Sequence, residues 1–151
     1  MKPQIEKLMT GLAGEYLVAG MMNLKGWVAS LTLKNYPGVD IFGKDPSTGA
    51  NVSIQVKSCR DSSFFIGVKR SERGQMDKKI QGPFVFVHIV KNEKVRFFIL
   101  SKSEFIDVVN TTDDIYFNKP RAKAIKPDYP IALTLKDLAP FENHWDSLWK
   151  D

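Results

Sequence analysis

The stretch that decides the fold is YPGVDIFGKDPSTGANVSIQVKS, residues 36–58. Apolar and polar residues alternate on both sides of a turn at 45–49 that is rich in Asp, Pro, Ser and Gly. Because alternate residues of a strand point to opposite faces of a sheet, the two segments predict a β-hairpin with its aliphatic side chains on one face. Asp40, Gln55 and Lys57 then share the other face. The hairpin therefore predicts a carboxylate, an amide and an ammonium on one patch of sheet.

Length and composition predict one globular domain over residues 1–151, with 43% hydrophobic and 26% charged residues. No apolar run approaches the roughly 18–20 residues that span a bilayer. Glu6 and Lys7 leave no signal-peptide core at the N-terminus. The single cysteine, Cys59, cannot form an internal disulfide, which fits a reducing compartment. We therefore expect a cytoplasmic protein that does not enter the membrane.

The charge of the chain is uneven, with a formal net value of +5. Residues 57–96 hold ten Lys and Arg against four Asp and Glu, whereas residues 137–151 hold four acids and one lysine. Residues 119–126 add four cations and no acid: Lys119, Arg121, Lys123 and Lys126. A basic middle and an acidic end indicate a polyanionic partner such as nucleic acid. A solvated, lysine-rich surface is the alternative interpretation.

The first element expected is a helix over residues 3–24, with Pro3 in its first turn and Gly26 just past its end. Apolar residues at helical spacing predict its buried face. These residues are Ile5, Leu8, Met9, Leu12, Tyr16 and Ala19. Glu15 falls on the flank of that face, where it is either a half-solvated rim residue or a functional acid.

The rest of the chain predicts an α/β protein built around a mixed sheet. After the first helix we expect a strand at 27–33, the hairpin, a short apolar run at 64–68 and a helix or helical loop at 69–80. Antiparallel strands at 84–90 and 95–100 follow, and then a helix at 101–109 and a long surface loop at 110–130. The chain ends with a short strand at 131–134 and a C-terminal helix or helical turn from 137, anchored by Phe141, Trp145 and Trp149. Strand 84–90 is apolar on both alternating sets, which is typical of a strand covered on both faces. Ser101 and Glu104 form a capping-box pattern at the start of their helix.

The polar residues of the hairpin suit phosphodiester hydrolysis, which needs charge neutralisation, a deprotonated water and a stabilised leaving oxygen. One cysteine and two widely separated histidines exclude a zinc-type cluster, so any metal would be a hard cation with oxygen ligands. Asp40, the Gln55 amide and the Val56 carbonyl can supply three oxygens for Mg²⁺. Lys57 can hold or help deprotonate the attacking water, and Glu15 can complete the ring directly or through a metal-bound water.

The order of a helical Glu, an Asp that opens a hairpin and a Q-x-K on the next strand resembles the PD-(D/E)XK nuclease superfamily. The matching pieces are Gly14-Glu15, Pro37-Gly-Val-Asp40 and Gln55-Val-Lys57, and residues 138–145 resemble the tails of small bacterial members. The similarity covers residues 5–100. It implies a restriction-endonuclease-like αβββαβ core with a mixed sheet flanked by helices, dependence on Mg²⁺ with Mn²⁺ as a substitute, and cleavage of DNA. The catalytic roles then fall on Glu15, Asp40, Gln55 and Lys57.

The leading hypothesis is a Mg²⁺-dependent DNA endonuclease that acts as a homodimer, since a duplex has two strands to cut. Four cations that follow the hairpin are expected to hold the DNA backbone, unless they form only a solvated basic face. They are Arg60, Lys69, Arg70 and Arg73. Gln55 replaces the acid more usual at its position. This keeps open a second hypothesis, an inactive module of the nuclease fold that binds nucleic acid or a protein.

Two further interpretations concern single residues. Asp40 and Lys57 could be salt-bridge partners across the hairpin instead of catalytic groups. His88 lies within an apolar strand, so we expect a hydrogen-bonded core histidine.

Overall fold

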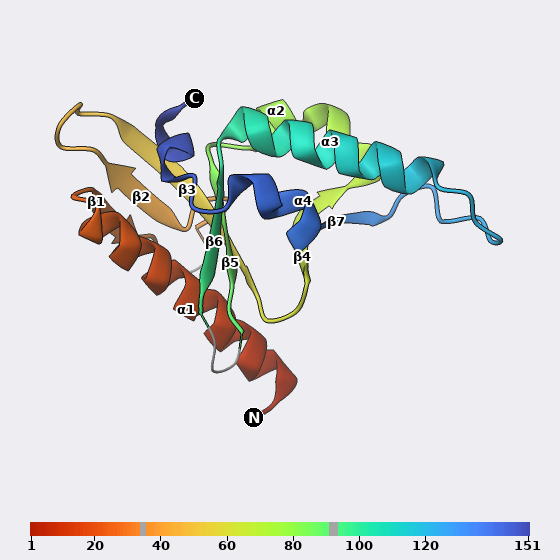
Figure 1. Ribbon diagram of the computed structural model, residues 1–151, viewed down its shortest axis with the longest axis horizontal. Helices are drawn as coiled ribbons and strands as arrows, with labels where there is room; N and C mark the ends of the chain where they lie inside the picture. Colours follow the sequence, from red (N-terminus) through yellow and green to blue (C-terminus); the bar gives the residue numbers. More distant parts are fainter. Residues whose placement is uncertain (34–35, 91–93) are drawn as a thin grey trace.

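The computed structural model describes residues 1–33, 36–90 and 94–151. Its centre is a five-stranded sheet in the order β1-β2-β3-β5-β6 (Figure 1). The strands are β1 (Val28–Leu31), β2 (Ile41–Lys44), β3 (Asn51–Cys59), β5 (Phe84–His88) and β6 (Arg96–Leu100). β3 and β5 run parallel, whereas the other neighbours are antiparallel. The predicted α/β class, a mixed sheet flanked by helices, is confirmed.

The β2–β3 hairpin has the predicted register and turn. Ile41 lies opposite Ile54, so the aliphatic residues of both strands share one face. In the turn, the Asp45 carboxylate accepts hydrogen bonds from the backbone N–H and the hydroxyl of Ser47. Gly49 has a φ of 76°, a conformation that only glycine adopts without strain. The turn residues therefore fix where the hairpin reverses direction, and the alternation of apolar residues fixes which face of each strand is buried.

Helix α1 (Pro3–Leu24) packs on the face of the sheet that carries the aliphatic side chains of the hairpin. Its buried residues recur every four positions: Thr10, Gly14, Val18 and Met22. The helix backbone lies close to β3, since a Cβ atom built on Gly14 would lie 1.8 Å from the hydroxyl oxygen of Ser58. Small side chains at the contact allow this approach.

The predicted buried face of this helix was wrong, although the helix itself has the predicted bounds. Most of the bulky residues assigned to it are exposed to solvent: Ile5, Leu8, Met9 and Tyr16. The helix instead packs through a row with small side chains at Thr10 and Gly14, which lets its axis lie closer to the sheet than leucine and tyrosine would permit. Helical spacing alone did not distinguish the two rows.

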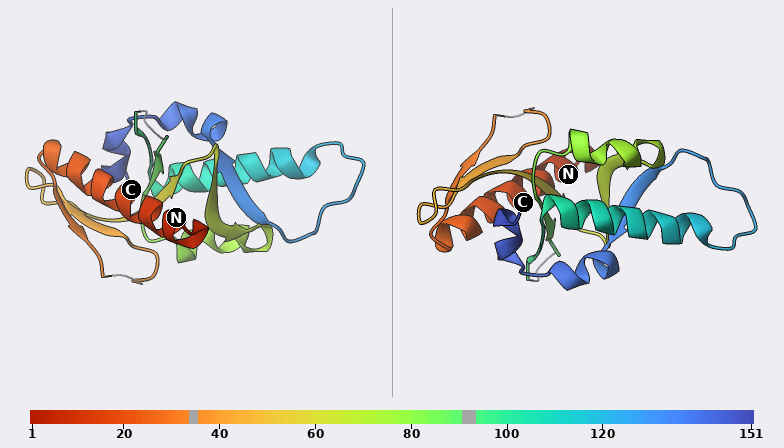
Figure 2. Two further views of the ribbon diagram at one scale, coloured as in Figure 1. Left: turned by 90° about the horizontal axis from the view of Figure 1, so that it is seen from below. Right: turned by 90° about the horizontal axis from the view of Figure 1, so that it is seen from above.

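The sheet is covered on both sides, as expected from the apolar pattern of β5, which is buried throughout (Figure 2). On one side α1 and the C-terminal turn η3 (Trp145–Trp149) enclose one hydrophobic cluster. On the other side α3 (Lys102–Asn118) and the ribbon of β4 (Ser63–Lys69) and β7 (Pro130–Thr134) enclose a second cluster around Phe86 and Phe105.

Short helical segments connect these parts. They are η1 (Arg70–Gln75) and α2 (Met76–Lys79) between β4 and β5, and α4 (Leu135–Leu138) and η2 (Ala139–Phe141) after β7. The first pair confirms the helical loop expected at 69–80. The second pair and η3 confirm a helical C-terminal segment, which begins slightly earlier than predicted.

Helix α3 begins as predicted but ends later. The Ser101 hydroxyl and the Glu104 carboxylate form the expected capping box. The helix continues to Asn118, so the prediction of a loop was wrong for residues 110–118. This part of the sequence is too polar to show an apolar face, and Asp113 occupies a buried position through ion pairs described below. Residues 119–129 form the remaining loop.

Candidate active site

Asp40 lies just before β2, beside Ile54 and Val56 of β3. Its backbone N–H donates to the carbonyl of Ile54 at 2.8 Å. Its carboxylate oxygen Oδ2 accepts a hydrogen bond from the backbone N–H of Val56 at 2.7 Å. Among the residues that the structure describes, Oδ1 accepts no hydrogen bond. The β3 backbone therefore fixes the carboxylate while one oxygen stays available to a ligand.

Gln55 and Lys57 are two residues apart on β3, so they share one sheet face, and both are half-buried. They line a cavity of about 210 Å³ together with Glu72 of η1 and Lys79 of α2. Burial lowers the pKa of the Lys57 ammonium, and the negative charge of Asp40 partly opposes this shift. Lys57 is therefore within electrostatic reach of Asp40 and is more readily deprotonated than an exposed lysine.

The salt-bridge alternative for Asp40 and Lys57 is not present. Within the described ranges, Lys57 takes part in none of the ion pairs of the structure. The Asp40 carboxylate bonds to the β3 backbone instead. Lys57 is half-buried and forms no direct ion pair with a described residue, so the burial of its charge is compensated only by the nearby charge of Asp40.

Glu15 reaches this region from α1. It follows Gly14, the residue through which the helix approaches β3, and it is half-buried. Glu15 and Asp40 both line a cavity of about 570 Å³ between α1 and the segment that follows β1. Burial raises the pKa of the Glu15 carboxyl, and the charge of Asp40 raises it further. The structure therefore places the two carboxylates close enough to repel each other.

The donor atoms around Asp40 suit a hard cation. The described residues contain no group of three or more His, Cys, Asp and Glu that could hold a metal ion, so the two carboxylates would need other ligands. The N–H and C=O of one strand residue point to the same strand edge. Because the Val56 N–H donates to Asp40, the Val56 carbonyl faces the edge where Asp40 lies. With the Gln55 amide this makes a set of oxygen donors only, which is the kind that Mg²⁺ prefers.

The four cations assigned to DNA contacts fall into two groups. Arg60 is exposed, donates from Nε to the Thr10 hydroxyl at 2.9 Å, and lines a cavity of about 760 Å³ with Lys57. Lys69 ends β4 and is also exposed. Both cations lie on open surface near the candidate site, and their binding role stays a prediction.

Arg70 and Arg73 instead belong to an internal network around Asp113, which the sequence did not reveal. Both guanidiniums pair with this carboxylate, whose side chain is fully buried. Arg73 also pairs with Asp114 at 2.7 Å, and the Tyr129 hydroxyl donates to Asp113. A phosphate contact from either arginine would have to compete with Asp113.

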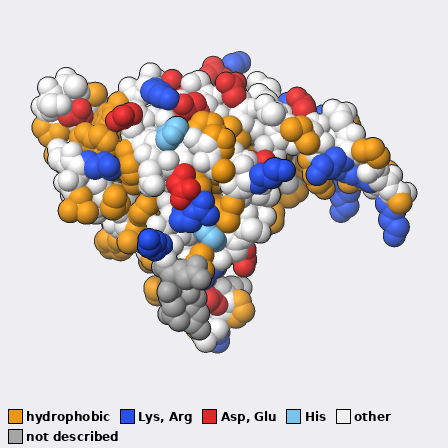
Figure 3. Space-filling model, in the orientation of Figure 1, with side chains coloured by type: hydrophobic (Ala, Val, Ile, Leu, Met, Phe, Trp, Pro, Cys, Tyr) orange, Lys and Arg blue, Asp and Glu red, His pale blue; other side chains and the backbone are white. Residues whose placement is uncertain are grey.

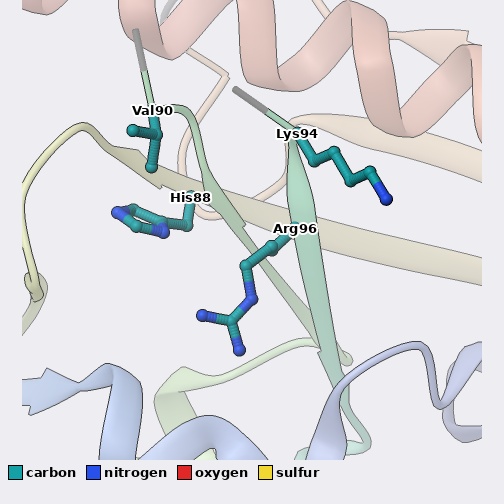
Figure 4. A pocket seen from close by; sticks show the side chains of 4 residues that line it. All are labelled: His88, Val90, Lys94 and Arg96. Atoms are coloured by element: carbon teal, nitrogen blue, oxygen red, sulfur yellow. The ribbon is translucent and has the colours of Figure 1, made fainter. Parts of the chain in front are cut away.

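A separate cavity of about 360 Å³ opens at the end of the β5–β6 pair (Figure 4). His88 lines it and is buried as predicted, but its Nδ1 has no hydrogen-bond partner in the described part of the chain. Arg96 lies opposite His88 and pairs with Glu142 through two hydrogen bonds of 2.8 and 2.9 Å. Cys59 is the neighbour of His88 on β3, and burial raises the pKa of its thiol to about 11. The raised pKa disfavours the thiolate, which is the nucleophilic form of cysteine.

Gly14 allows α1, and with it Glu15, to approach β3 closely, and its place in the Gly14-Glu15 motif did not predict this role. The repeat of small or apolar residues at 10, 14, 18 and 22 carries a signal for close helix packing.

In the part of the chain that the structure describes, every helix is too short or too polar to span a bilayer.

Comparisons with known proteins give structural likeness but no match in sequence. No family model matches the chain, and no curated protein matches it. Among solved structures, the chain is similar to Hjc from Archaeoglobus fulgidus, a Holliday junction resolvase from an archaeal hyperthermophile. The TM-score is 0.47 at 12% identity, with 86% of this chain and 93% of that chain covered. A likeness at this level carries no information about individual residues or about activity.

Proposed function

We propose that the chain is a metal-dependent endonuclease that hydrolyses DNA phosphodiester bonds. The observation that carries the proposal is the arrangement around Asp40. Its carboxylate is held by the N–H of Val56, which lies between Gln55 and Lys57 on β3, and its charge raises the pKa of Glu15. Among the residues that the structure describes, Asp40, Lys57 and Glu15 form no ion pair that would explain them as structural.

Each residue has a distinct proposed role. Asp40, Glu15, the Gln55 amide and the Val56 carbonyl would hold Mg²⁺ or Mn²⁺, which when bound neutralises phosphate charge. Lys57 accepts the proton of the attacking water, because its lowered pKa makes the neutral amine more accessible. As the water oxygen bonds to phosphorus, the bond to the leaving sugar oxygen breaks and that oxygen takes a proton from solvent.

The test is cleavage of supercoiled plasmid DNA by the full chain, with Mg²⁺, with Mn²⁺ and with a chelator. We expect Lys57→Met and Asp40→Asn to lower the rate by about 10²–10⁴-fold, the usual contribution of a positioned acid–base group. Lys44→Met and Asp107→Asn are matched controls on exposed residues and should cleave like the wild type. The proposal fails if no divalent ion supports cleavage, or if both site variants cleave as fast as the controls.

A second candidate function is an inactive module of the same fold that binds nucleic acid or a protein. The neutral side chain of Gln55 favours it, since Gln55 adds no negative charge to the proposed metal ligands Asp40 and Glu15. Calorimetric titration with Mn²⁺ separates the two functions. Uptake of the ion that Asp40→Asn removes supports the nuclease, whereas absence of uptake together with intact DNA binding supports the module.

The proposal extends to the assembly. Cutting both strands of a duplex with one site per chain favours two copies over one, so we propose that the active form is a homodimer. Sedimentation equilibrium with and without DNA tests this part. A monomer under conditions in which both strands are cut would contradict it.

A further inference from the structure

The loop of residues 119–129, here called the basic arm, projects from the body along the longest axis of the molecule (Figures 1 and 2). Its cations are Lys119, Arg121, Lys123 and Lys126, and no acid precedes Asp128. All four cations are exposed. Within the described part of the chain, none of them forms an ion pair. Lysine and arginine side chains gather at this end of the surface (Figure 3).

The base of the arm is fixed on η1 by two hydrogen bonds. Asp128 accepts a hydrogen bond from the backbone N–H of Ser71 at 3.1 Å, and this bond lowers the pKa of its carboxyl. The carbonyl of Tyr129 accepts a hydrogen bond from the backbone N–H of Arg70 at 3.0 Å. Asp128, the one acid of the arm, therefore lies at its base and holds the arm to η1. Residues 119–127 contain four positive charges and no negative charge.

Aromatic side chains support the other end of the arm. Arg121 lies over the ring of Tyr116 at 4.4 Å from its centroid and donates to the Tyr116 carbonyl. Tyr116 in turn contacts the ring of Tyr129 edge-on at 5.0 Å. Pro120 and Pro127 restrict the backbone near both ends. The arm thus presents its cations from a partly restrained loop, which reduces the entropy cost of binding.

The same short segment connects the arm to the candidate active site. Glu72 of η1 lines the cavity that contains Gln55 and Lys57. Arg70, also in η1, holds α3 through Asp113. Lys69, an exposed cation, pairs in register with Pro130, where the arm enters β7. Cations are therefore present near the site, at the base of the arm and along the arm.

We propose that the basic arm binds the phosphate backbone of a DNA duplex, as a contact separate from the active site. This inference rests on the proposed function and adds a second binding surface to it. A membrane surface fits the arm less well, because binding to a bilayer surface uses an apolar face beside the cations. Ile125 is the only large aliphatic side chain between residues 119 and 127. Of the exposed apolar residues that precede the arm on α3, Tyr116 lies under Arg121 and Phe117 under Arg70, which leaves Ile115.

The test measures DNA binding by fluorescence anisotropy with a labelled duplex in a chelator, so that no cleavage occurs. Affinity is measured from about 50 to 200 mM salt, because each phosphate contact contributes to the salt dependence. The arm variant is Lys119→Gln/Lys123→Gln/Lys126→Gln. The control variant, Lys25→Gln/Lys44→Gln/Lys136→Gln, makes the same charge change on exposed lysines elsewhere. Thermal unfolding of all proteins verifies their folding.

We expect the arm variant to weaken binding and to reduce the salt slope by about one unit per lysine, about three in total. The control variant should change the slope by less than about one unit. The inference is overturned if the wild type does not bind DNA, if both variants lose the same affinity, or if the arm variant binds DNA normally. It is also overturned if the arm variant loses binding only to phosphatidylserine vesicles. Cleavage is not part of this readout, so an arm that binds DNA in a chain that does not cleave it would contradict only the nuclease proposal.

Discussion

Two regions of this molecule contain acids and cations side by side, and they use them in opposite ways. In the Asp113 cluster, one buried carboxylate is paired with two guanidiniums and a tyrosine hydroxyl. In the Asp40 patch, the carboxylate bonds to the backbone and Lys57 stays unpaired within the described chain. The first arrangement satisfies its charges internally, as a structural network must. In the second arrangement, Asp40 Oδ1 and the Lys57 amine have no protein partner among the described residues, so both can contact a ligand. A structural network pairs its charged groups with each other, whereas a binding site leaves some of them unpaired.

The largest effect expected from this comparison is on stability. Asp113→Asn removes the charge that two partly buried guanidiniums share, so we expect the free energy of unfolding to fall by about 3 kcal/mol. Asp40→Asn should change it far less, because its main partner is a neutral N–H. Urea unfolding of both variants measures the difference. Equal losses would show that the Asp40 patch is also structural.

A smaller effect concerns how α1 brings Glu15 to the patch. Gly14→Ala places a Cβ atom 1.8 Å from the Ser58 hydroxyl oxygen and 2.9 Å from its Cβ, so the helix must shift. We expect a loss of about 2 kcal/mol, typical of overpacking, and a slower cleavage rate. Urea unfolding and the plasmid assay measure the two effects.

The matched control is Gly20→Ala in the same helix, where a Cβ atom meets nothing within 4 Å. It should stabilise the helix by about 0.5–1 kcal/mol. Ser58→Gly combined with Gly14→Ala should restore part of the loss, since it removes both clashing atoms. If Gly14→Ala is neutral, the close approach of helix and strand is not what positions Glu15.

The smallest effect is a difference of sign in the pH dependence of stability. The pKa of Glu142 is lowered by its hydrogen bond to Arg96, so this carboxylate stabilises the fold above its unfolded pKa and loses that contribution as pH falls through the folded value. The pKa of Glu15 is raised by burial and by Asp40, so ionised Glu15 costs stability once pH rises above the folded value. The two glutamates should therefore respond oppositely to amide substitution.

Thermal unfolding between about pH 3 and pH 8 tests this expectation. At neutral pH, Glu142→Gln should lower the melting temperature and Glu15→Gln should raise it slightly. Both differences should vanish at a pH below the folded and unfolded values. A lower melting temperature for Glu15→Gln at neutral pH would place Glu15 among the structural acids.

Much of the fold could be predicted from local pattern. Strand alternation gave the hairpin and the shared face of Gln55 and Lys57, because side-chain direction in a strand has a fixed period. The capping box gave the start of α3 in the same way. The buried row of α1 and the end of α3 could not be predicted. Both depend on what packs against the helix: Gly14 against β3, and Asp113 against two arginines.

By itself, the sequence determined which polar side chains share one sheet face, because that depends only on backbone geometry. It also determined the excess of positive charge in the middle of the chain. Only the tertiary structure decided which charges are free. Arg70 and Arg73 look equivalent to Arg60 and Lys69 in the sequence, yet Asp113, 40 residues or more away along the chain, pairs with the first two. Charges act through space, so their partners become known only when the chain is folded.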